Sequence, residues 1–568
     1  MAQIRHIAIE NFRCIEKLDW HPCAGVNCLI GPGDAGKSSI LDAIDLCLGA
    51  RRTVQFTDAD FHGLDVTAPV VITITIGDLS DALKSMDTYG AYVRSFDPTT
   101  KTIDDEPEAG KETVLSVRLQ IGSDLDPVWS LVSDRAKAQG LARNLTWGDR
   151  VRLSPTRIGV LADSNLAWRR GSVLNRLTDE KADTSAALAS AARDARRAFG
   201  DLADAQLGET LKIVAETARE LGIPAGDKLK AMLDAHSVSF SGGTIALHGD
   251  DGVPLRALGV GSTRLLVAGL QRKAAKESSV LLIDELEHGL EPHRIIRLLG
   301  SIGAKEMPPP IQAFLTTHSP VALRELRGDQ LWVVRKLAGV HKLDLVGTTD
   351  PIQGTIRSQP EAFLSRSVVV CEGASEVGLM RGLDLHFVAS GRVSLNALGA
   401  VLVDAGGVNK IYGRANVIRG LGYRCAVLRD DDVLPDNAQE ALFTFNSGTL
   451  FKWNANYALE HALFYLVSDA AVHRLLARAE ELHETDLIEA HIKGASGGTL
   501  TLADCRGTMT PQIRETLAKA AKSNKNPWFK TVSAMEDVAR DIVGPDLQNA
   551  HADLRNVVEA LFGWCASA

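Results

Sequence analysis

A glycine-rich loop near the start of the chain has a residue spacing that suits phosphate binding. Gly31-Pro-Gly-Asp-Ala-Gly-Lys-Ser follows the spacing Gly-x4-Gly-Lys-Ser/Thr, between an apolar run and a segment with helical apolar spacing. Glycines let backbone amides turn toward phosphates, the lysine can bridge β- and γ-phosphates, and the serine hydroxyl can ligate Mg²⁺. The loop therefore predicts a site for ATP and Mg²⁺. Its candidate residues are Gly31, Gly33, Asp34, Gly36, Lys37, Ser38 and Ser39.

Two acids after a second apolar run would complete such a site. Val280-Leu-Leu-Ile precedes Asp284 and Glu285, which is typical of a buried strand that ends at an acidic turn. We expect Asp284, with Ser38, to hold the Mg²⁺ shell. We expect Glu285 to polarise the water that attacks the γ-phosphate.

Further segments around the acid pair point to the same chemistry. Leu258-Gly-Val-Gly-Ser precedes a predicted helix. Ser262 is expected to cap this helix, which would leave backbone amides free to face a γ-phosphate, with Gly261 beside it as a further candidate. Gly289-Leu-Glu-Pro follows the acids, and another apolar strand ends at His318.

The order of these segments resembles the ABC-type ATPase heads of the SMC, Rad50 and RecF group, in which Walker A, signature, Walker B, D-loop and switch histidine follow one another. Asn11-Phe12-Arg13 near the start is also similar to those heads. The resemblance implies that two heads sandwich two ATP molecules, with Glu285 and His318 as catalytic residues. The usual signature serine would fall at Gly259, and Ser262 is the candidate substitute. The family's Q-loop glutamine is not assigned, with Gln55 and Gln120 as candidates.

Acids also follow apolar runs in the second half of the chain. Glu372 follows Val368-Val-Val-Cys, Asp404 follows Ala400-Val-Leu-Val, and Asp430 comes just after Cys425-Ala-Val-Leu. Acids at the carboxyl ends of successive parallel strands meet at one edge of a sheet. Crowded carboxylates repel unless cations neutralise them, and oxygen-only ligands favour Mg²⁺ or Mn²⁺. Two such ions would suit phosphodiester cleavage.

The pattern Glu-Gly, then Asp, then Asp-x-Asp resembles the Toprim fold of topoisomerases, primases and some nucleases. An ABC-type head followed by Toprim is similar to the OLD family of ATP-dependent nucleases, over nearly the whole chain. The resemblance implies a lysine near the C-terminus that stabilises the cleavage transition state, with Lys530 first and Lys525 second. Asp431 leaves the register of the Asp-x-Asp pair open. The implied metal-site acids are Glu372, Glu376, Asp404, Asp430, Asp432 and Glu460.

The function implied is an ATP-binding and ATP-hydrolysing, divalent-metal-dependent DNA endonuclease or nickase, in phage defence or DNA processing, with a possible helicase partner. The alternative is a RecF-like DNA-binding ATPase clamp whose Toprim-like domain is a non-catalytic docking module. A transporter ATPase subunit is a weaker third interpretation, because the acidic domain would have no role in it.

These residues require an α/β fold with two parts. We expect an ABC-type ATPase domain at 1–162 and 236–365, interrupted by a helical insert at 163–235 that could mediate homodimerisation together with the heads. A Toprim-like parallel α/β domain with a helical C-terminal part follows at 366–568. Strands are expected at 26–30, 70–76, 237–247, 280–283, 312–316 and 330–334, and a helix at 39–48.

Composition limits the other possibilities. The 568 residues are 45% hydrophobic and carry a formal charge of −9, so buried cores are expected, and DNA would have to bind through a local basic groove or bound metal ions. There is no apolar run long enough to span a membrane. The 8 cysteines form no Cys-x-x-Cys pair, which favours reduced thiols in a cytoplasmic protein.

Overall fold

A computed structural model of the chain shows two compact units. The structure describes residues 2–51, 53–159, 165–166, 172–174, 177, 184–220, 231, 247–250, 252–274, 280–337, 339–453, 456–523 and 525–567. The first unit comprises Met1–Cys28, Gly36–Ala322 and Leu337–His341, and the second comprises Leu29–Ala35, Leu323–Lys336 and Lys342–Ala568. Each is α/β in composition.

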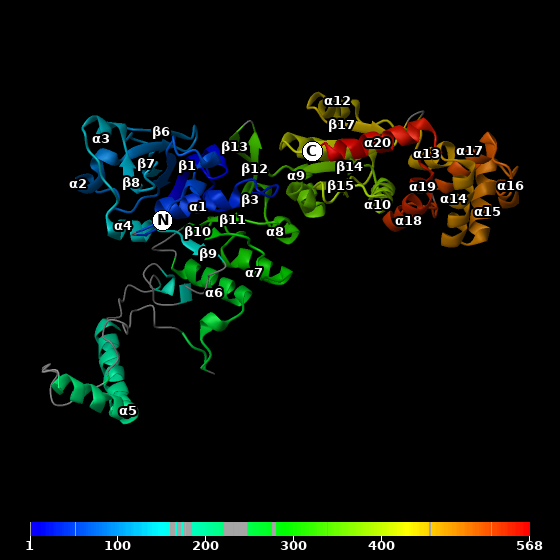
Figure 1. Cartoon of the computed structure of the whole chain (residues 1–568). Helices are drawn as coiled ribbons and strands as arrows, with labels where there is room; N and C mark the ends of the chain where they lie inside the picture. The colour runs from blue at the N-terminus through cyan, green and yellow to red at the C-terminus, as the bar shows by residue number, and fades with distance from the viewer. Residues whose placement is uncertain are drawn as a thin grey trace. The chain divides into compact units, whose positions relative to one another are not determined.

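Antiparallel strands form one part of the first unit (Figure 1). β1 (Gln3–Phe12) pairs with β2 (Ile15–Trp20) on one side and β4 (Val70–Gly77) on the other. β4 continues to β7 (Glu112–Ile121), which pairs with β5 (Arg94–Asp97) and β8 (Pro127–Val132). Ile7 and Ile9 of β1 are both buried, because alternate side chains of a strand point to the same face, and a register shift between Ile4 and His6 interrupts this alternation.

The phosphate-binding loop lies between a fully buried strand and a helix. β3 (Val26–Ile30) has every residue buried, and α1 (Lys37–Leu48) begins directly after Gly36. Farther along the chain, β10 (Val280–Ile283) pairs in parallel with β9 (Thr156–Ile158) and β11 (Gln312–Thr316). The strands predicted at 280–283 and 312–316 are therefore confirmed.

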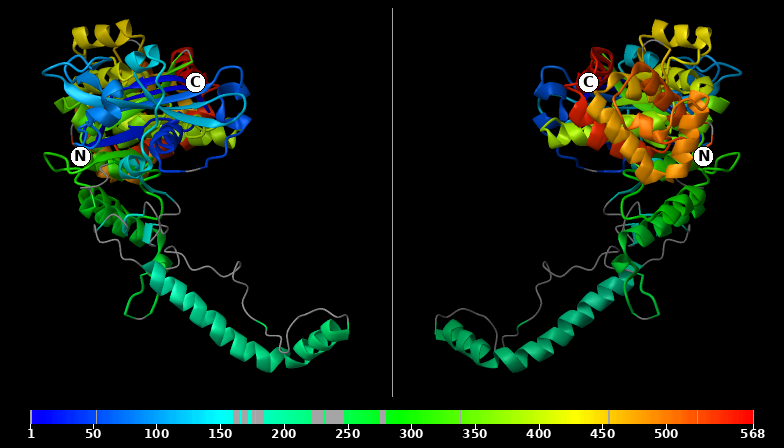
Figure 2. Two further views of the ribbon diagram at one scale, coloured as in Figure 1. Left: turned by 90° about the vertical axis from the view of Figure 1, so that its left-hand side faces the viewer. Right: turned by 90° about the vertical axis from the view of Figure 1, so that its right-hand side faces the viewer.

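The region predicted as a helical insert contains the long helix α5 (Thr184–Glu220), shown from two sides in Figure 2. The rest of the insert lies almost entirely outside the described residues, as does the strand predicted at 237–247 except for its last residue. α6 (Val260–Lys273) and α7 (Pro292–Ser301) follow. None of the helices in the described ranges combines the length and apolarity needed to cross a membrane.

The second unit contains a parallel sheet with the strand order β15-β14-β16-β17. β14 (Ser367–Cys371) is central, with β15 (Ala400–Asp404) on one side and β16 (Arg424–Arg429) on the other, and β17 (Thr449–Lys452) pairs with β16. Cys371 is paired with both Asp404 and Leu428. The acids that follow these strands therefore begin at one edge of the sheet, as predicted.

Helices surround this sheet and continue to the end of the chain (Figure 1). α10 (Ala374–Ala389) follows β14, and α11 (Val408–Gly420) follows β15. The helices after β17 include α13 (Leu459–Leu466), α14 (Asp469–Leu482), α15 (Thr485–Ser496), α17 (Pro511–Ala521), α18 (Val532–Val538) and α20 (Ala552–Ala566).

The remaining elements are mostly short. They are β6 (Thr102–Asp104), α2 (Met86–Tyr89), α3 (Asp134–Ala138), α4 (Trp147–Leu153), α8 (Pro320–Glu325), β12 (Leu331–Leu337), β13 (Val340–Leu345), α9 (Asp350–Ser358), α12 (Asn437–Phe445), α16 (Leu502–Cys505) and α19 (Gly544–Asp546).

Two glycines let α10 and α18 approach each other unusually closely. A Cβ added at Gly378 would lie 2.5 Å from the carbonyl oxygen of Val532, and one at Gly382 would lie 2.2 Å from that of Glu536. Real Cβ atoms do not come this close to backbone oxygens, so neither position accepts a side chain without moving one helix.

We expect Gly382→Ala to lower the free energy of unfolding by about 1–3 kcal/mol, because the new methyl group forces the two helices apart. Gly413→Ala in α11 is the matched control: a Cβ there meets nothing within 4 Å, so better helix propensity should stabilise the chain by about 0.5–1 kcal/mol. Thermal unfolding of the full chain measures both. Equal melting temperatures for the two variants would contradict the close-packing interpretation.

Candidate ATP and metal sites

Backbone conformation in the glycine-rich loop explains its glycines. Gly31 has φ +127°, and a Cβ there would lie 2.9 Å from the carbonyl oxygen of Val334. Gly36 has φ +86° and forms the N-cap of α1 without a side chain. Asp34 also has positive φ, and a Cβ at Gly33 would meet nothing within 4 Å. Lys37, the first residue of α1, is buried.

The structure brings Ser38 and Asp284 into direct contact. The Ser38 hydroxyl donates a hydrogen bond of 3.0 Å to Asp284 Oδ1, and the Thr316 hydroxyl donates one of 2.6 Å to the same oxygen. Thr316 Oγ1 in turn accepts from the backbone N–H of Glu285 at 2.8 Å. The two residues predicted to share an Mg²⁺ ion are thus adjacent, and Thr316 from β11 orients the carboxylate.

A buried arginine that the sequence analysis missed holds the acidic turn. Glu285 has φ +48°, which is an uncommon conformation for a residue other than glycine. Arg264, which is fully buried, donates to the carbonyl oxygens of Glu285 at 2.9 Å, His288 at 2.8 Å and Asp284 at 2.8 Å. These bonds fix the strained backbone and leave the Glu285 side chain mostly exposed.

His318 is held beside the same turn through its backbone. Its N–H donates to Glu287 Oε1 at 2.8 Å, and the Thr317 hydroxyl donates to Glu287 Oε2 at 2.6 Å. Burial lowers the pKa of the His318 imidazole, and the positive charge of Lys37 lowers it further. Both effects favour the neutral ring, in which one nitrogen can donate a hydrogen bond and the other can accept one.

The expected cap at Ser262 is wrong. α6 begins at Val260 with Gly259 as its N-cap, and no side chain caps it. Ser262 already lies in the first turn, where its hydroxyl accepts from Arg294 Nη1 at 3.2 Å. Gly261 has a packing reason instead: a Cβ there would lie 2.4 Å from the carbonyl oxygen of Gly289. The segment containing Gly289 therefore packs directly on the first turn of α6.

In the second unit, Glu376 and Asp430 are the most strongly perturbed acids of the candidate metal site. Glu376, only 3% exposed, accepts from the Gly373 N–H at 2.8 Å through Oε2. Burial and then the Glu372 carboxylate raise its pKa to about 7. Asp430 is 7% exposed and accepts from the Leu459 N–H at 3.0 Å. Burial and then the charges of Glu376 and Glu372 raise its pKa to about 9.

Glu372 joins this group through the backbone of Asp430. Its Oε2 accepts from the Asp430 N–H at 3.0 Å. Burial raises the pKa of Glu372, the bond from Asp430 opposes this, and the charge of Asp432 raises it further. Three acids from the ends of β14 and β16 and the start of α10 thus destabilise one another's charged forms, and a bound cation would relieve this repulsion.

Glu460 and Lys530 complete the group. Glu460 in α13 is 1% exposed, and its Oε2 has no hydrogen-bond partner among the described residues. Its Oε1 lies 3.6 Å from Lys530 Nζ. Burial lowers the pKa of Lys530, but the carboxylates of Glu460, Glu376 and Asp430 together raise it above its ordinary value. Lys525, the second candidate, is exposed.

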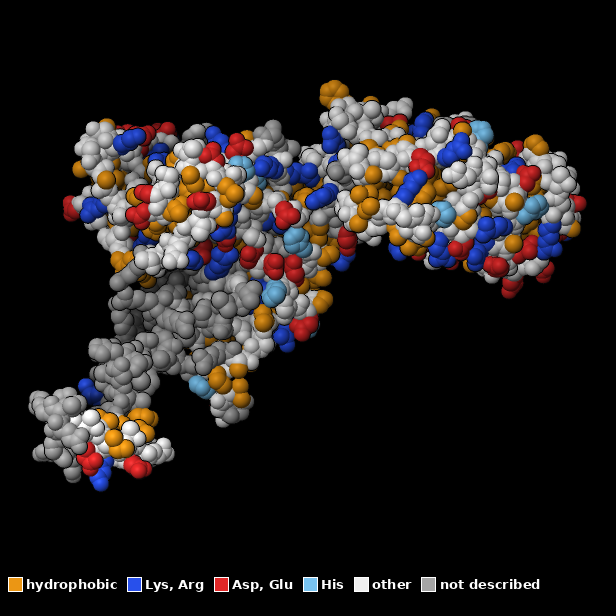
Figure 3. Space-filling view, in the orientation of Figure 1, with side chains coloured by type: hydrophobic (Ala, Val, Ile, Leu, Met, Phe, Trp, Pro, Cys, Tyr) orange, Lys and Arg blue, Asp and Glu red, His pale blue; other side chains and the backbone are white. Residues whose placement is uncertain are grey.

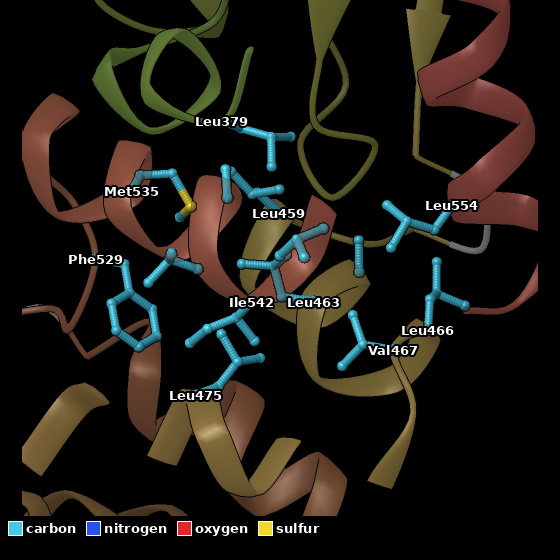
Figure 4. Close-up of a cluster of buried hydrophobic side chains, with 14 of the residues drawn as sticks. Leu379, Leu459, Leu463, Leu466, Val467, Leu475, Phe529, Met535, Ile542 and Leu554 are labelled. Carbon is cyan, nitrogen blue, oxygen red and sulfur yellow. The ribbon is translucent and has the colours of Figure 1, made fainter. Parts of the chain in front are cut away.

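Hydrophobic neighbours position these side chains. Leu459 and Phe529, which precede Glu460 and Lys530, belong to one buried cluster together with Leu379 of α10, and Figure 4 shows all three in that cluster. All three are fully buried. The core therefore fixes where Glu376, Glu460 and Lys530 project.

The side chains of the Asp430-Asp431-Asp432 run have different partners. Asp431 Oδ1 accepts from Lys452 Nζ at 2.9 Å and lies 3.5 Å from Arg429. Burial would raise the Asp431 pKa, but the hydrogen bond from Lys452 and other contacts leave it lowered. Asp432 instead forms an ion pair with Lys522 and acts electrostatically on Glu372 and Asp430. Asp430 and Asp432 are therefore the pair that faces the acidic group.

Asp404 takes a different position. It ends β15, and its Oδ1 accepts from the Gly406 N–H at 2.8 Å within its own loop. No three of the acids hold one oxygen each within 4.8 Å of one another; among the described residues, only His6, Asp19 and His21 meet that limit. The acids are thus electrostatically coupled although their oxygens do not meet at one point, and the Lys530 ammonium group, 3.6 Å from Glu460, offsets part of their repulsion.

The donor set nevertheless suits Mg²⁺ or Mn²⁺. All the candidate donors are carboxylate oxygens, which hard divalent cations prefer. The unpartnered oxygen of buried Glu460 would gain a partner from a cation, because a buried polar atom without one is costly. The raised pKa values of Glu376 and Asp430 would fall when a cation binds.

Two known domain families match this chain, one in each half. The family described as "AAA domain, putative AbiEii toxin, Type IV TA system" matches residues 26–324, and the "Overcoming lysogenization defect protein-like, TOPRIM domain" matches residues 363–432. The second match contains Glu372, Glu376, Asp404, Asp430 and Asp432 but ends before Glu460 and Lys530.

Individual relatives span different lengths. An OLD nuclease from Thermus scotoductus is 24% identical over 479 residues, which cover 76% of this chain and 82% of that protein. The DNA replication and repair protein RecF of Nitrosococcus oceani is 43% identical over 67 residues, 11% of this chain and 18% of that protein. A crystal structure of an Smc head bound to the C-terminal winged-helix domain of ScpA is 16% identical, with a TM-score of 0.33, covering 60% of this chain and 96% of that chain.

The matched ATPase region covers more than half of the 568 residues and contains the glycine-rich loop, Asp284, Glu285 and His318. The chain therefore belongs to this AAA-domain ATPase family, carries an OLD-like TOPRIM domain behind the ATPase domain, and is homologous to an OLD nuclease.

Proposed function

We propose that the protein is an ATP-hydrolysing, divalent-metal-dependent DNA endonuclease or nickase. The observation that carries this is the group of buried acids around Lys530, in which Glu376 and Asp430 have pKa values raised to about 7 and about 9. Such perturbed acids concentrate at functional sites. The OLD nuclease relative supports phosphodiester cleavage as the reaction.

The acids would hold two Mg²⁺ or Mn²⁺ ions. Bound there, the ions supply a water of lowered pKa and neutralise charge on the leaving oxygen. The protein itself contributes Lys530, whose ammonium group would stabilise the charge that develops on the scissile phosphate. The proposed ligands are Glu372, Glu376, Asp430, Asp432 and Glu460, with Asp404 as a supporting acid.

The ATPase half would regulate cutting. Lys37 would contact the phosphates, Ser38 and Asp284 would hold Mg²⁺, Glu285 would orient the attacking water, and His318 would contact the γ-phosphate. The proposed assembly is a homodimer formed through the ATPase heads and α5. We propose a cytoplasmic role in phage defence or DNA processing, with a helicase as a possible partner.

DNA would be held by local cations. On the face drawn in Figure 3, lysine and arginine side chains of the second unit lie interspersed with acids, and the net charge is −9. Lys522, paired with Asp432, and Lys530, near Glu460, are cations beside the acidic group. Binding should therefore depend on added divalent cation.

Plasmid nicking tests the proposal. Supercoiled DNA is incubated with the purified full chain and Mg²⁺ or Mn²⁺, with and without ATP. We expect metal-dependent conversion to the nicked or linear form. Tight DNA binding with no scission under any metal condition would instead favour the RecF-like clamp, for which the short RecF match is the supporting observation.

Lysine substitutions separate the two candidates for the phosphate contact. We expect Lys530→Ala to lower the cleavage rate by about 10²-fold, because it removes the charge that the acids Glu460, Glu376 and Asp430 surround. Lys525→Ala is the matched control and should change the rate less than about threefold, since Lys530, and not Lys525, is the lysine placed beside Glu460. Single-turnover nicking measures both. The reverse ranking would assign the role to Lys525.

A further inference from the structure

A cluster of two histidines and an aspartate lies on the β1–β2 hairpin of the first unit, in residues that neither candidate site uses. His6 is in β1, Asp19 is in β2, and His21 follows directly. The register pairs Ile7 with Trp20, so His6 lies opposite His21 across the two strands. One ligand atom from each of the three side chains lies within 4.8 Å of the other two.

The Asp19 carboxylate lies close to both rings. His6 Nε2 is 3.0 Å from Asp19 Oδ2, and His21 Nε2 is 3.9 Å from Asp19 Oδ1. The ring centroids of His6 and His21 are 4.6 Å apart with an interplanar angle of 32°. The two Nε2 atoms are therefore directed toward the same carboxylate, and the donor set is two imidazole nitrogens and carboxylate oxygen.

His21 is already oriented in the manner of a metal ligand. Its Nδ1 lies 3.1 Å from the carbonyl oxygen of Arg5, and a carbonyl can only accept, so Nδ1 carries the proton. The lone pair is then on Nε2, which is the atom facing Asp19. Metal-binding histidines almost always donate their other N–H to such a partner. The Phe96 ring stacks on His21 at 6.1 Å and 18° and restricts its rotation.

The two histidines of the cluster are mostly buried, whereas the aspartate is mostly exposed. The side chains of His6 and His21 are 14% and 21% exposed, whereas that of Asp19 is 65% exposed. A cation can therefore reach the imidazole nitrogens from solvent by displacing the Asp19 carboxylate slightly. Because the ligands stand on paired strands, the imidazoles need little rearrangement to bind it.

We propose that His6, Asp19 and His21 form a Zn²⁺ site in the ATPase unit. Imidazole nitrogen and carboxylate oxygen are ordinary zinc ligands, and three protein ligands leave a fourth position for water. Imidazole favours Zn²⁺ over Mg²⁺, which requires oxygen donors. A bound ion would join β1 to the end of β2 and stabilise the folded hairpin.

Zinc retention tests the site. Tag-free full-length protein, stripped with a chelator, is incubated with ZnCl₂ and desalted, and metal content and melting temperature are measured. We expect about one zinc per chain that His6→Gln and His21→Gln lose, with apparent affinity at least roughly tenfold weaker. Zinc should raise the melting temperature of the unchanged protein, and not of these two variants. Their melting temperatures without metal show whether they fold.

Two controls keep the result specific. His293→Gln alters an exposed histidine in α7 and should retain zinc. Asp430→Asn alters the acidic group of the second unit and should also retain it, so loss of the nuclease proposal would leave this site intact. Zinc that is not retained by the unchanged protein, or that both histidine variants retain equally, overturns the proposal and leaves an ordinary histidine–aspartate ion pair.

Discussion

Replacing Asp430 with asparagine is expected to lower the rate of DNA strand cleavage by about 10²- to 10³-fold while ATP hydrolysis continues. Asparagine keeps the size of the side chain and can still accept from the Leu459 N–H. It cannot supply the negative charge that a divalent cation would require. Single-turnover nicking at saturating metal, with phosphate release measured in parallel, gives both rates.

The neighbouring acid provides a matched control for this variant. Asp431→Asn removes a carboxylate that is bonded to Lys452 and Arg429 instead of facing the acidic group. We expect its cleavage rate to stay within about threefold of the unchanged protein, because the carboxylate that is lost pairs with Lys452 and Arg429 and not with a proposed metal ion. Equal cutting by Asp430→Asn and the unchanged protein would remove Asp430 from the site.

The raised pKa values give this result a pH dependence. Glu376 and Asp430 bind protons up to about pH 7 and about pH 9, and a cation must displace those protons. At low metal concentration, the cleavage rate should therefore rise between about pH 6 and 9.

The free energy of unfolding should change with pH in the opposite direction. Because the pKa of Asp430 is higher in the folded chain than in the unfolded chain, the folded chain keeps this proton to a higher pH. Stability therefore falls as pH rises from about 4 to 9. Asp430→Asn should abolish that part of the decline.

Replacing Glu285 with glutamine is expected to slow ATP hydrolysis by about 10²- to 10⁴-fold while ATP still binds. The backbone of the turn is held by Arg264 and Thr316, which bond to main-chain atoms, so the substitution removes only the carboxylate. Phosphate release measures hydrolysis, and equilibrium binding of a fluorescent ATP analogue measures affinity.

An exposed glutamate nearby serves as the control for hydrolysis. Glu291→Gln alters a side chain that pairs with Arg294, and its rate should remain within about twofold because exposed pairs contribute little. Loss of nucleotide binding in Glu285→Gln would show that the residue supports the site instead of the attacking water. Undiminished hydrolysis would assign the role to another acid, with Glu287 the nearest candidate.

Local elements were predictable because their signals are short-range. The strand predicted at 26–30 matches β3, since an unbroken apolar run ended by glycine leaves one interpretation. The helix predicted from residue 39 begins two positions earlier at Lys37, because Gly36 caps it with a left-handed backbone. Acids at strand ends, and the sheet edge that they share, were predictable for the same reason.

Contacts between distant residues were not predictable. Arg264 and Thr316 support the ATP-site acids across 20 to 32 positions, and nothing in their local sequence separates them from ordinary helix and strand residues. The direction of Asp431 depends on Lys452 in another strand. The close packing at Gly378 and Gly382 was predictable in part. Two glycines four positions apart lie on the same face of a helix and can admit a second helix there. The sequence does not show which helix this is, because α18 lies far along the chain.

The close packing of α18 against the glycines of α10 affects when, during translation, the second unit can be completed. Glu372, Glu376 and Asp430 leave the ribosome well before α18 does, and domains fold as their segments emerge. A nascent chain that ends before Lys530 contains these acids but has neither the ammonium group nor the helix that packs against α10. For the proposed nuclease, the ability to cut DNA would therefore arise late in translation, because a chain that stops before Lys530 would lack both the ammonium group and α18.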